Sequence, residues 1–397
     1  MPRIVQINLQ RNYGGGETYT RSIVQVLSEL ECDSYLITHP KAHFWTQLNL
    51  PLSLEVMPLV DLGSFKRFLS RFRDKGIILS HGSLGHELIA TAKSCGWRVM
   101  AICHMPPQGR HRNEFSGHEL VFGVSDYVID GLRKDLVATW PTALLGAADL
   151  SPRGPSNGKL EKNSEYAWDT RKIRDVVFGF LYDRFNSGCD RLVFNKKPGV
   201  TLGIFSGITP IKQFPLLFRI VAPIISKYPN LNLEIVGAGG YASVRDLKRS
   251  LAPCKRQVRF WGKQMDPSPV FSNFDFLIAG LPEKEALGLN IIEAQFSNVP
   301  VLAVRAPPFT QTILENKTGF LFTDPREDQG KDFHALLARI LSGRISRPEP
   351  LKHPEHLQLF SFESFKTRLS ETPLLSDFTP PKKANKILGD TATIESN

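Results

Sequence analysis

The chain has 397 residues, of which 42% are apolar, and a formal net charge of +10. This length exceeds one ordinary hydrophobic core, so we expect two domains of about 100–200 residues each. The composition is that of a soluble globular protein, and no apolar run approaches the ~20 residues that span a bilayer. The positive charge suits nucleotide phosphates or an acidic membrane surface. The lack of a nucleic-acid-binding motif in the sequence argues against nucleic acid as a partner.

The N-terminal residues run directly into a predicted strand and do not have the layout of a signal peptide. The cysteines are odd in number and scattered, without the spacing of metal ligands. We therefore expect reduced thiols and a cytoplasmic protein. The cysteines are Cys32, Cys95, Cys103, Cys189 and Cys254.

The first half of the chain alternates between short apolar strands and helices. A strand is predicted at 3–8, and the glycine-rich turn Gly14-Gly-Gly-Glu17 then opens a helix to about Leu30. This alternation is typical of a parallel sheet that is covered by helices on both faces. Further strands are predicted at 34–38, 76–80, 98–103 and 120–125.

A second alternation of the same kind begins after Asn195-Lys-Lys-Pro-Gly199, which we interpret as a hinge. The sequence thus predicts an α/β protein with two doubly wound, Rossmann-like domains. Ligands of such sheets bind at the carboxyl ends of the strands, so we expect a site in the cleft between the domains. Strands of the second half are predicted at 200–205, 233–236, 258–261, 274–279, 301–304 and 319–322.

The predicted boundaries divide the chain into four parts. Residues 1–197 form the first domain, with an insertion at about 151–197 that we expect to pack on it. Residues 198–354 form the second domain, and residues 355–378 form a closing segment. The polar tail at 379–397 is predicted to be disordered.

The most informative segment lies between the strands predicted at 274–279 and 301–304 in the second domain. It reads Glu285-Ala-Leu-Gly-Leu-Asn-Ile-Ile-Glu293 and carries two glutamates eight positions apart. Glu285 is predicted on the loop after the first strand, and Glu293 about two turns into the next helix. The first helical turn offers backbone N–H groups to an anion. The carboxylates suit the hydroxyl groups of a sugar nucleotide.

Three other loops are candidates for ligand contact. Gly15 and Gly16 let the backbone approach a phosphate or sugar, or simply make a tight turn. Gly237-Ala-Gly239-Gly-Tyr-Ala242 fits a dinucleotide pattern and is expected to contact phosphate or base. The next strand ends without the acidic residue that binds a ribose in NAD enzymes. Lys212 lies at a helix start, where the helix dipole disfavours a cation. This misfit favours a functional role over a merely solvated lysine, and we expect Lys212 to neutralise a diphosphate.

His81 and His104 each follow a predicted strand of the first domain. A single histidine is usually a packed, hydrogen-bonded side chain. Two of them at strand ends on the cleft side favour contact with an acceptor, His104 more than His81. The sequence contains neither a Ser-His-Asp arrangement nor a metal-type cluster.

Residues 65–75 carry aromatic side chains at Phe65, Phe68 and Phe72 with basic residues around them. Such a basic amphipathic helix can lie on an anionic membrane surface. The alternative is a helix whose aromatic face packs on the sheet while its charges face water. The sequence leaves both interpretations open.

With these motifs, the chain resembles the retaining glycosyltransferases of the GT-B fold, in the large family numbered four. The resemblance extends over nearly the whole length and includes the glycine loop, the strand-end histidines and the two-glutamate motif. It also includes Asn316-Lys-Thr-Gly319-Phe-Leu-Phe322. Finally, Phe360-Ser-Phe-Glu363 resembles the family's closing helix, which crosses back to the first domain.

The resemblance implies roles for individual residues. Glu285 would bind the donor sugar, Glu293 the ribose and Lys212 the diphosphate. The amides of Gly288 and Leu289 would contact the donor, and the strand at 258–262 would lead to the base. The residues that would face the acceptor and the reactive end of the donor are His104, His81, Gly15 and Gly16.

The implied reaction transfers a hexose-type sugar with retention from a UDP- or GDP-linked donor, without a bound metal or other cofactor. Positive side chains and helix N-termini would stabilise the departing nucleotide. The acceptor would be a glycan or a lipid-linked molecule of the cell surface, as in lipopolysaccharide or exopolysaccharide synthesis. The enzyme would then be cytoplasmic, at or near the inner face of the membrane.

The chain departs from the family pattern at several positions. Gly207 stands where the family has an arginine, five positions before Lys212. Loss of one charge-assisted phosphate contact costs ~2–4 kcal/mol of transition-state stabilisation. Ala286-Leu287 replaces a Gly-Phe pair, and Ala306-Pro-Pro308 replaces a glycine-rich stretch.

These departures favour an alternative, a non-catalytic GT-B protein that binds a nucleotide sugar or serves as a scaffold partner. Retention of both glutamates and the lysine favours the enzyme. A third hypothesis, an NAD-dependent oxidoreductase, rests on the glycine pattern alone.

Overall fold

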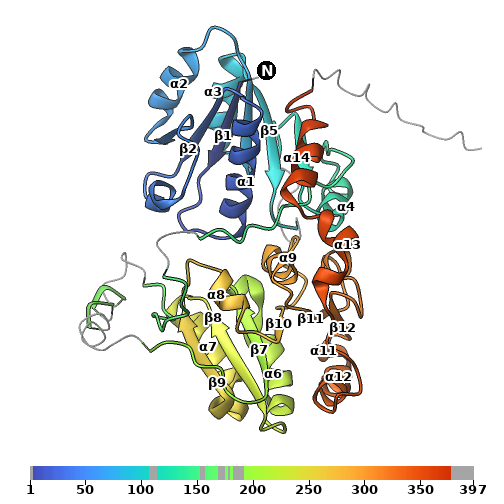
Figure 1. Cartoon of the computed structure of the whole chain (residues 1–397). Helices are drawn as coiled ribbons and strands as arrows, with labels where there is room; N and C mark the ends of the chain where they lie inside the picture. The colour runs from blue at the N-terminus through green and yellow to red at the C-terminus, as the bar shows by residue number, and fades with distance from the viewer. Residues whose placement is uncertain are drawn as a thin grey trace, which may run out of the picture.

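The computed structural model describes residues 3–106, 114–152, 157–168, 175–177, 179–181 and 192–376. The tail predicted to be disordered and much of the insertion, including Cys189, lie outside these residues. Two α/β domains are stacked, with the first above the second in Figure 1.

The first domain contains a six-stranded parallel sheet with the order β3-β2-β1-β4-β5-β6. The central strands β1 and β4 are buried along their whole length, because helices cover both faces. The strands are β1 (Ile4–Asn8), β2 (Ser34–Thr38), β3 (Glu55–Pro58), β4 (Ile77–His81), β5 (Arg98–Cys103) and β6 (Leu120–Gly123). The helices are α1 (Gly15–Glu29), α2 (Leu62–Ser70), α3 (His86–Ser94) and α4 (Asp126–Lys134).

The second domain repeats this arrangement with the order β12-β11-β10-β7-β8-β9. Its strands are β7 (Val200–Phe205), β8 (Leu231–Val236), β9 (Val258–Gly262), β10 (Phe276–Ile278), β11 (Val301–Val304) and β12 (Gly319–Phe322). Its helices are α6 (Phe214–Ile225), α7 (Tyr241–Ser250), α8 (Ser268–Phe271), α9 (Leu289–Phe296), α10 (Phe309–Thr312), α11 (Pro325–Asp328) and α12 (Lys331–Leu341).

The predicted fold class and strands are confirmed, apart from small shifts of their ends. The edge strand β3 was not predicted, since its sequence lacks an apolar run and most of it is exposed. In both sheets the first strand pairs with neighbours on either side, β1 with β2 and β4, and β7 with β8 and β10. The crevice for a ligand in such sheets opens at the carboxyl ends of these strands.

Two closing helices, α13 (Pro354–Gln358) and α14 (Phe362–Ser370), run along one side of the molecule from the second domain to the first (Figure 1). The side chains of Phe365 and Leu369 are buried in the hydrophobic core of the first domain. The Ala148 N–H donates to the carbonyl of Phe360 at 3.0 Å. The C-terminal segment is therefore part of the first domain's core.

The predicted basic helix at 65–75 is shorter than expected, since α2 ends at Ser70. Phe65 and Phe68 are buried in the core of the first domain, while Lys66 and Arg67 are exposed. The aromatic face is thus used for packing, and only the charges are available to a membrane surface. In the described part of the chain, no helix combines the length and apolarity needed to cross a bilayer.

We predict that Phe365→Ala destabilises the protein by about 3–5 kcal/mol, because it leaves a cavity in the core. The measurement is urea unfolding followed by tryptophan fluorescence. Thr367→Ala, an exposed change on the same helix, should alter the free energy of unfolding by less than about 0.5 kcal/mol. Equal effects of the two changes would show that α14 is not a core element.

Candidate active site

The two-glutamate motif forms the connection between β10 and α9. Gly288 has a left-handed backbone with a φ of 84°, a conformation that glycine adopts at little cost. The helix begins only at Leu289, so Glu293 lies about one turn into α9 rather than two, as predicted. The helix start is held in place by Asn290, whose Nδ2 donates to the carbonyl of Phe205 at 3.0 Å.

Lys212 and Glu285 form an ion pair between Nζ and Oε2. Lys212 ends a short 3₁₀ helix (Pro210–Lys212) after β7, and Glu285 follows β10, the neighbouring strand. Their side chains are 25% and 16% exposed, so the pair stabilises the fold by only about 1 kcal/mol. A ligand can therefore separate the two charges at little cost.

The two glutamates differ in their accessibility. Glu285 is partly exposed, whereas Glu293 is only 2% exposed on the inner side of α9. A carboxylate is rarely buried without compensating partners. Glu285 is thus the more accessible of the two carboxylates.

The glycine loop of the first domain lies opposite the start of α9. The Cδ1 atom of Leu289 lies 3.8 Å from the position of a Cβ on Gly15. Its Cδ2 atom would lie only 2.9 Å from a Cβ on Gly146, so a larger side chain at this position would displace Leu289. A Cβ on Gly16 would lie 3.9 Å from the ring of His104. The glycine loop, His104 and the two-glutamate motif therefore meet in one place.

The start of α4 also contacts the motif loop. Ser125 Oγ donates to the carbonyl of Ala286 at 2.5 Å, and Tyr127 donates to the carbonyl of Glu283 at 3.5 Å. Asp126 exchanges two hydrogen bonds with the side chain of Gln311, at 2.8 and 3.1 Å. These contacts were not predicted, although Ser125 at a strand-to-helix junction is a typical capping residue.

His81 and His104 are adjacent, since β4 and β5 are neighbours in the sheet. Their Nδ1 and Nε2 atoms are 3.1 Å apart. Burial lowers the pKa of His104 to about 4. The pKa of His81 lies well below its usual value because of burial and the nearby His104. Both rings are therefore neutral at neutral pH and act as hydrogen-bonding groups rather than cations.

The sequence analysis missed the polar side chains behind these histidines. Gln6 and Asn8 are fully buried on β1 and bond to His81 and to Thr20. Glu17 is buried on α1 and accepts from the Gly14 N–H at 2.8 Å. Burial raises its pKa. Polar residues inside an otherwise apolar strand are the signal that would have found this network.

Gly237 and Gly239, which were predicted to contact the donor, have backbone amides that form hydrogen bonds within the protein. The Gly237 N–H donates to the carbonyl of Gly262 at 2.8 Å. The Gly239 N–H donates to the carbonyl of Glu165 at 3.0 Å, and its carbonyl accepts from Ala167 at 2.9 Å. These backbone groups already have protein partners, and the contact of the two glycines with a phosphate or a base stays a prediction.

Gly239 is bonded to the insertion, which we expected to pack on the first domain. Its residues 157–168 lie instead on the second domain, across the ends of β8 and β9. The Asn163 N–H donates to the carbonyl of Trp261 at 2.9 Å, and Leu160 is buried in the second domain's core. Glu165 forms an ion pair with Lys248 at 2.6 Å. Burial alone would raise the pKa of Glu165, but Lys248 and the nearby Lys162 lower it.

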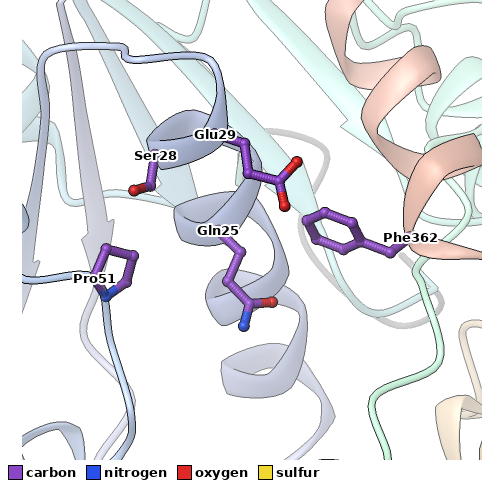
Figure 2. Close-up of a pocket in the computed structure, with 5 residues that line it drawn as sticks. All are labelled: Gln25, Ser28, Glu29, Pro51 and Phe362. Atoms are coloured by element: carbon purple, nitrogen blue, oxygen red, sulfur yellow. The ribbon is translucent and has the colours of Figure 1, made fainter.

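A shallow hollow of about 340 Å³ lies elsewhere, on the outer side of the first domain (Figure 2). Its lining includes Glu29, at the C-terminal end of α1, and Phe362 of α14. The glycine loop is at the other end of α1, some 20 Å away along the helix axis. The hollow is therefore separate from the candidate site. Among the described residues, no three His, Cys, Asp or Glu side chains gather as metal ligands would.

Two facing α/β domains joined by closing helices at the C-terminal end define the GT-B fold of glycosyltransferases. The structure of Anabaena Alr3699/HepE in complex with UDP and glucose is similar, with a TM-score of 0.66, 14% identity and coverage of 94% of this chain and 99% of that one. The apo lipopolysaccharide outer core galactosyltransferase WaaB has a TM-score of 0.62, 13% identity and coverage of 93% and 98%. At these identities the likeness shows the fold.

The second domain adds a match in sequence. Residues 199–342, from β7 to the end of α12, match the family model described as "Glycosyl transferases group 1". The D-inositol 3-phosphate glycosyltransferase of Corynebacterium urealyticum is 24% identical over 227 residues, 52% of each chain. That of Rhodococcus erythropolis is 28% identical over 213 residues, 50% of this chain and 47% of its own. The matched part thus spans about half the length of these curated relatives.

We predict that stability falls as the pH drops from 6.5 toward about 4, because the unfolded chain takes up protons on His81 and His104 that the folded protein excludes. Urea unfolding at several pH values measures this slope. His104→Gln should flatten it, whereas His86→Gln, at an exposed position, should leave it unchanged. An equal slope in the wild type and His104→Gln would contradict the neutral state of His104.

Proposed function

We propose that the protein is a retaining, metal-independent glycosyltransferase of family four. It would move a hexose from a UDP- or GDP-linked sugar to a glycan or lipid-linked acceptor of the cell surface. The observation that carries the proposal is the Lys212–Glu285 pair at the carboxyl ends of β7 and β10, opposite the glycine loop.

The site offers complementary charges to both halves of a nucleotide sugar. The ammonium of Lys212 would leave Glu285 and bind the diphosphate, and the carboxylate would then accept from sugar hydroxyls. The N–H groups of Gly288 and Leu289 at the start of α9 would add a partial positive charge. Glu293 is buried behind them on the same helix, so it would bind the ribose once the donor displaces the side chains that cover its carboxylate.

In the reaction, the bond between the anomeric carbon and the phosphate oxygen breaks, and its electron pair stays on the phosphate. The acceptor hydroxyl bonds to the anomeric carbon on the same face. Its proton passes to the leaving phosphate oxygen, so no carboxylate base is required. Lys212 and the start of α9 stabilise the charge that develops on the phosphate. His104, with His81 behind it, would orient the hydroxyl groups at the first domain's side of the cleft.

Names of similar proteins support the substrate classes. HepE is described in complex with UDP and with glucose, which supports a nucleotide-sugar donor. WaaB is a lipopolysaccharide galactosyltransferase, and the curated relatives act on an inositol phosphate. An acceptor at a membrane would place the enzyme at the inner face, with the exposed charges of α2 available to anionic lipid.

A second candidate is a nucleotide-sugar-binding protein without turnover, serving as a scaffold. The observation that favours it is Gly207, which stands where the family that the sequence resembles has a phosphate-binding arginine. The two candidates share the donor site and differ only in the rate of transfer.

We predict that UDP or GDP raises the melting temperature, since a ligand at about 100 times its Kd stabilises by about 2.7 kcal/mol. Glu293→Ala should remove most of the shift. Lys284→Ala, at an exposed position in the same loop, should retain it. If no nucleotide stabilises the wild type, both candidate functions are wrong.

We expect Lys212→Ala to lower the rate of donor hydrolysis or sugar transfer by about 10²–10³-fold, because it removes the cation at the leaving diphosphate. A screen of nucleotide sugars with coupled detection of the released nucleotide measures the rate. A wild-type rate in Lys212→Ala would refute the assignment of the diphosphate site. A wild type that binds nucleotide but releases none from any sugar would favour the scaffold.

We further predict that Gly207→Arg folds normally and strengthens nucleotide binding or turnover. Gly207 is exposed and lacks a left-handed backbone, and an added Cβ would meet only Thr209 at an ordinary 3.6 Å. The new guanidinium would restore a contact of about 2–4 kcal/mol. Gly207→Gln is the uncharged control, and an equal response to both changes would contradict the electrostatic explanation.

A further inference from the structure

Basic side chains lie together at one corner of the first domain, where β1 and β2 end. These strands are parallel neighbours, and their last residues, Asn8 and Thr38, lie in register. Arg11 is in the loop after β1, and His39 and Lys41 are in the loop after β2. The carboxyl ends of the strands in this sheet point toward the second domain (Figure 1), so this basic cluster of Arg11, His39 and Lys41 lies on the crevice side.

The basic cluster has no acidic side chain in its own loops. Residues 9–16 and 39–54, which leave β1 and β2, contain neither Asp nor Glu. Glu17, the first acidic residue after the first of these loops, is buried on α1. Arg11 and Lys41 are exposed, and neither forms an ion pair with another residue that the structure describes. The cluster therefore carries positive charge that an anion would balance.

The hydrogen bonds within the basic cluster conflict with one another. Arg11 Nε is 3.0 Å from His39 Nε2, and the backbone N of Lys41 is 3.0 Å from His39 Nδ1. The guanidinium and the amide both carry protons, whereas a neutral imidazole has one lone pair and an imidazolium has none. In either tautomer, therefore, two N–H groups point at each other. An anionic oxygen that accepts from Arg11 and from the His39 ring removes this conflict.

Aromatic packing holds the two loops of the basic cluster together. Tyr13, two residues after Arg11, meets the ring of Phe44 edge to face, with the ring centroids 5.4 Å apart. Both rings pack against Trp45, which is buried. The hydroxyl of Tyr13 is 3.0 Å from Thr18 Oγ1 on α1. A site on such packed loops loses little conformational freedom when it binds a ligand.

The basic cluster lies apart from the two histidines of the candidate site. The first sheet has the partial order β2-β1-β4-β5, and His104 follows β5. Since neighbouring strands are ~4.8 Å apart, roughly 10–14 Å separates His104 from the basic cluster. A molecule that reaches both positions thus carries its charged group away from the hydroxyl near His104.

We propose that the basic cluster binds a phosphate group of the acceptor, so that the acceptor is a phosphate-bearing molecule. This assignment rests on the proposed function, in which the first domain holds the acceptor. The diphosphate of the donor has the same chemistry, but Lys212 and the start of α9 would bind it on the second domain.

The test is NMR of the full chain with ¹³C-labelled histidine, in which His39→Gln assigns the signals of His39. The probes are glucose 6-phosphate, inositol 1-phosphate and glycerol 3-phosphate, each compared with its unphosphorylated parent at the same ionic strength. Partial burial and the charges of Arg11 and Lys41 lower the pKa of His39, so a bound phosphate should raise it. We expect at least one phosphate, and none of the parents, to shift the His39 signals to saturation and to raise this pKa. No response of His39 to any of the phosphates would overturn the proposal.

Variants of the two cations show whether they form the site. Arg11→Gln and Lys41→Gln should each weaken the binding of the phosphate about ten- to hundredfold, because each removes a charged partner. Lys93→Gln, which removes an exposed charge from α3, should leave the binding unchanged. An equal loss in all of these variants would indicate a response to net charge alone and overturn the proposal.

Thermal shifts distinguish an acceptor phosphate from the donor diphosphate. Arg11→Gln should keep the wild-type shift with UDP or GDP, and with a phosphorylated acceptor it should raise KM about tenfold while changing kcat less. Loss of the nucleotide shift in Arg11→Gln would assign the basic cluster to the donor and overturn the proposal. Failure of the wild type to bind any nucleotide would refute the proposed function and with it the acceptor role, whereas the NMR titration would still establish or refute the phosphate site itself.

Discussion

The candidate site depends on a hydrophobic core that both domains share. Ala286, Leu287 and Ile292, from the motif loop and α9 of the second domain, are buried together with strands and helices of the first. Phe365 and Leu369 of α14 enter the same core. Burying each of the larger side chains, Leu287, Ile292, Phe365 and Leu369, stabilises by roughly 2 kcal/mol. This shared core therefore holds the glycine loop against the start of α9, and the geometry of the candidate site follows from it.

The titratable side chains of the candidate site differ in their accessibility. The Lys212–Glu285 pair is half-buried, so that each partner can exchange the other for a ligand. Glu293, by contrast, is buried beside the shared core. The neutral histidines lie on the opposite wall, where burial has removed their charge. The proposed donor would thus meet a cation on the second domain and the neutral histidines on the first, which would favour one orientation of a nucleotide sugar.

The sequence predicted the parts that depend on local patterns. Buried strands are recognisable as apolar runs, and neighbouring strand ends explain why His81 and His104 are close. The edge strand β3 has no such run and was missed. The insertion was misplaced because it binds the second domain largely through backbone groups, at Asn163 and Ala167 for example. Backbone hydrogen bonds of this kind leave no trace in residue type, so Gly239 remained a donor-binding candidate.

Gly207 lies in a loop whose position is fixed by backbone hydrogen bonds. Ile208 donates to the carbonyl of Ala238, and a Cβ on Gly237 would lie 1.9 Å from the carbonyl of Ser206, so the loops after β7 and β8 lie side by side. The insertion fixes the second of these loops through Gly239. Gly207 itself stays exposed and has space around it. A glycine in place of the arginine that the resemblance implies would therefore be a change of side chain on an intact backbone, which alters the electrostatics of the candidate site without changing its fold.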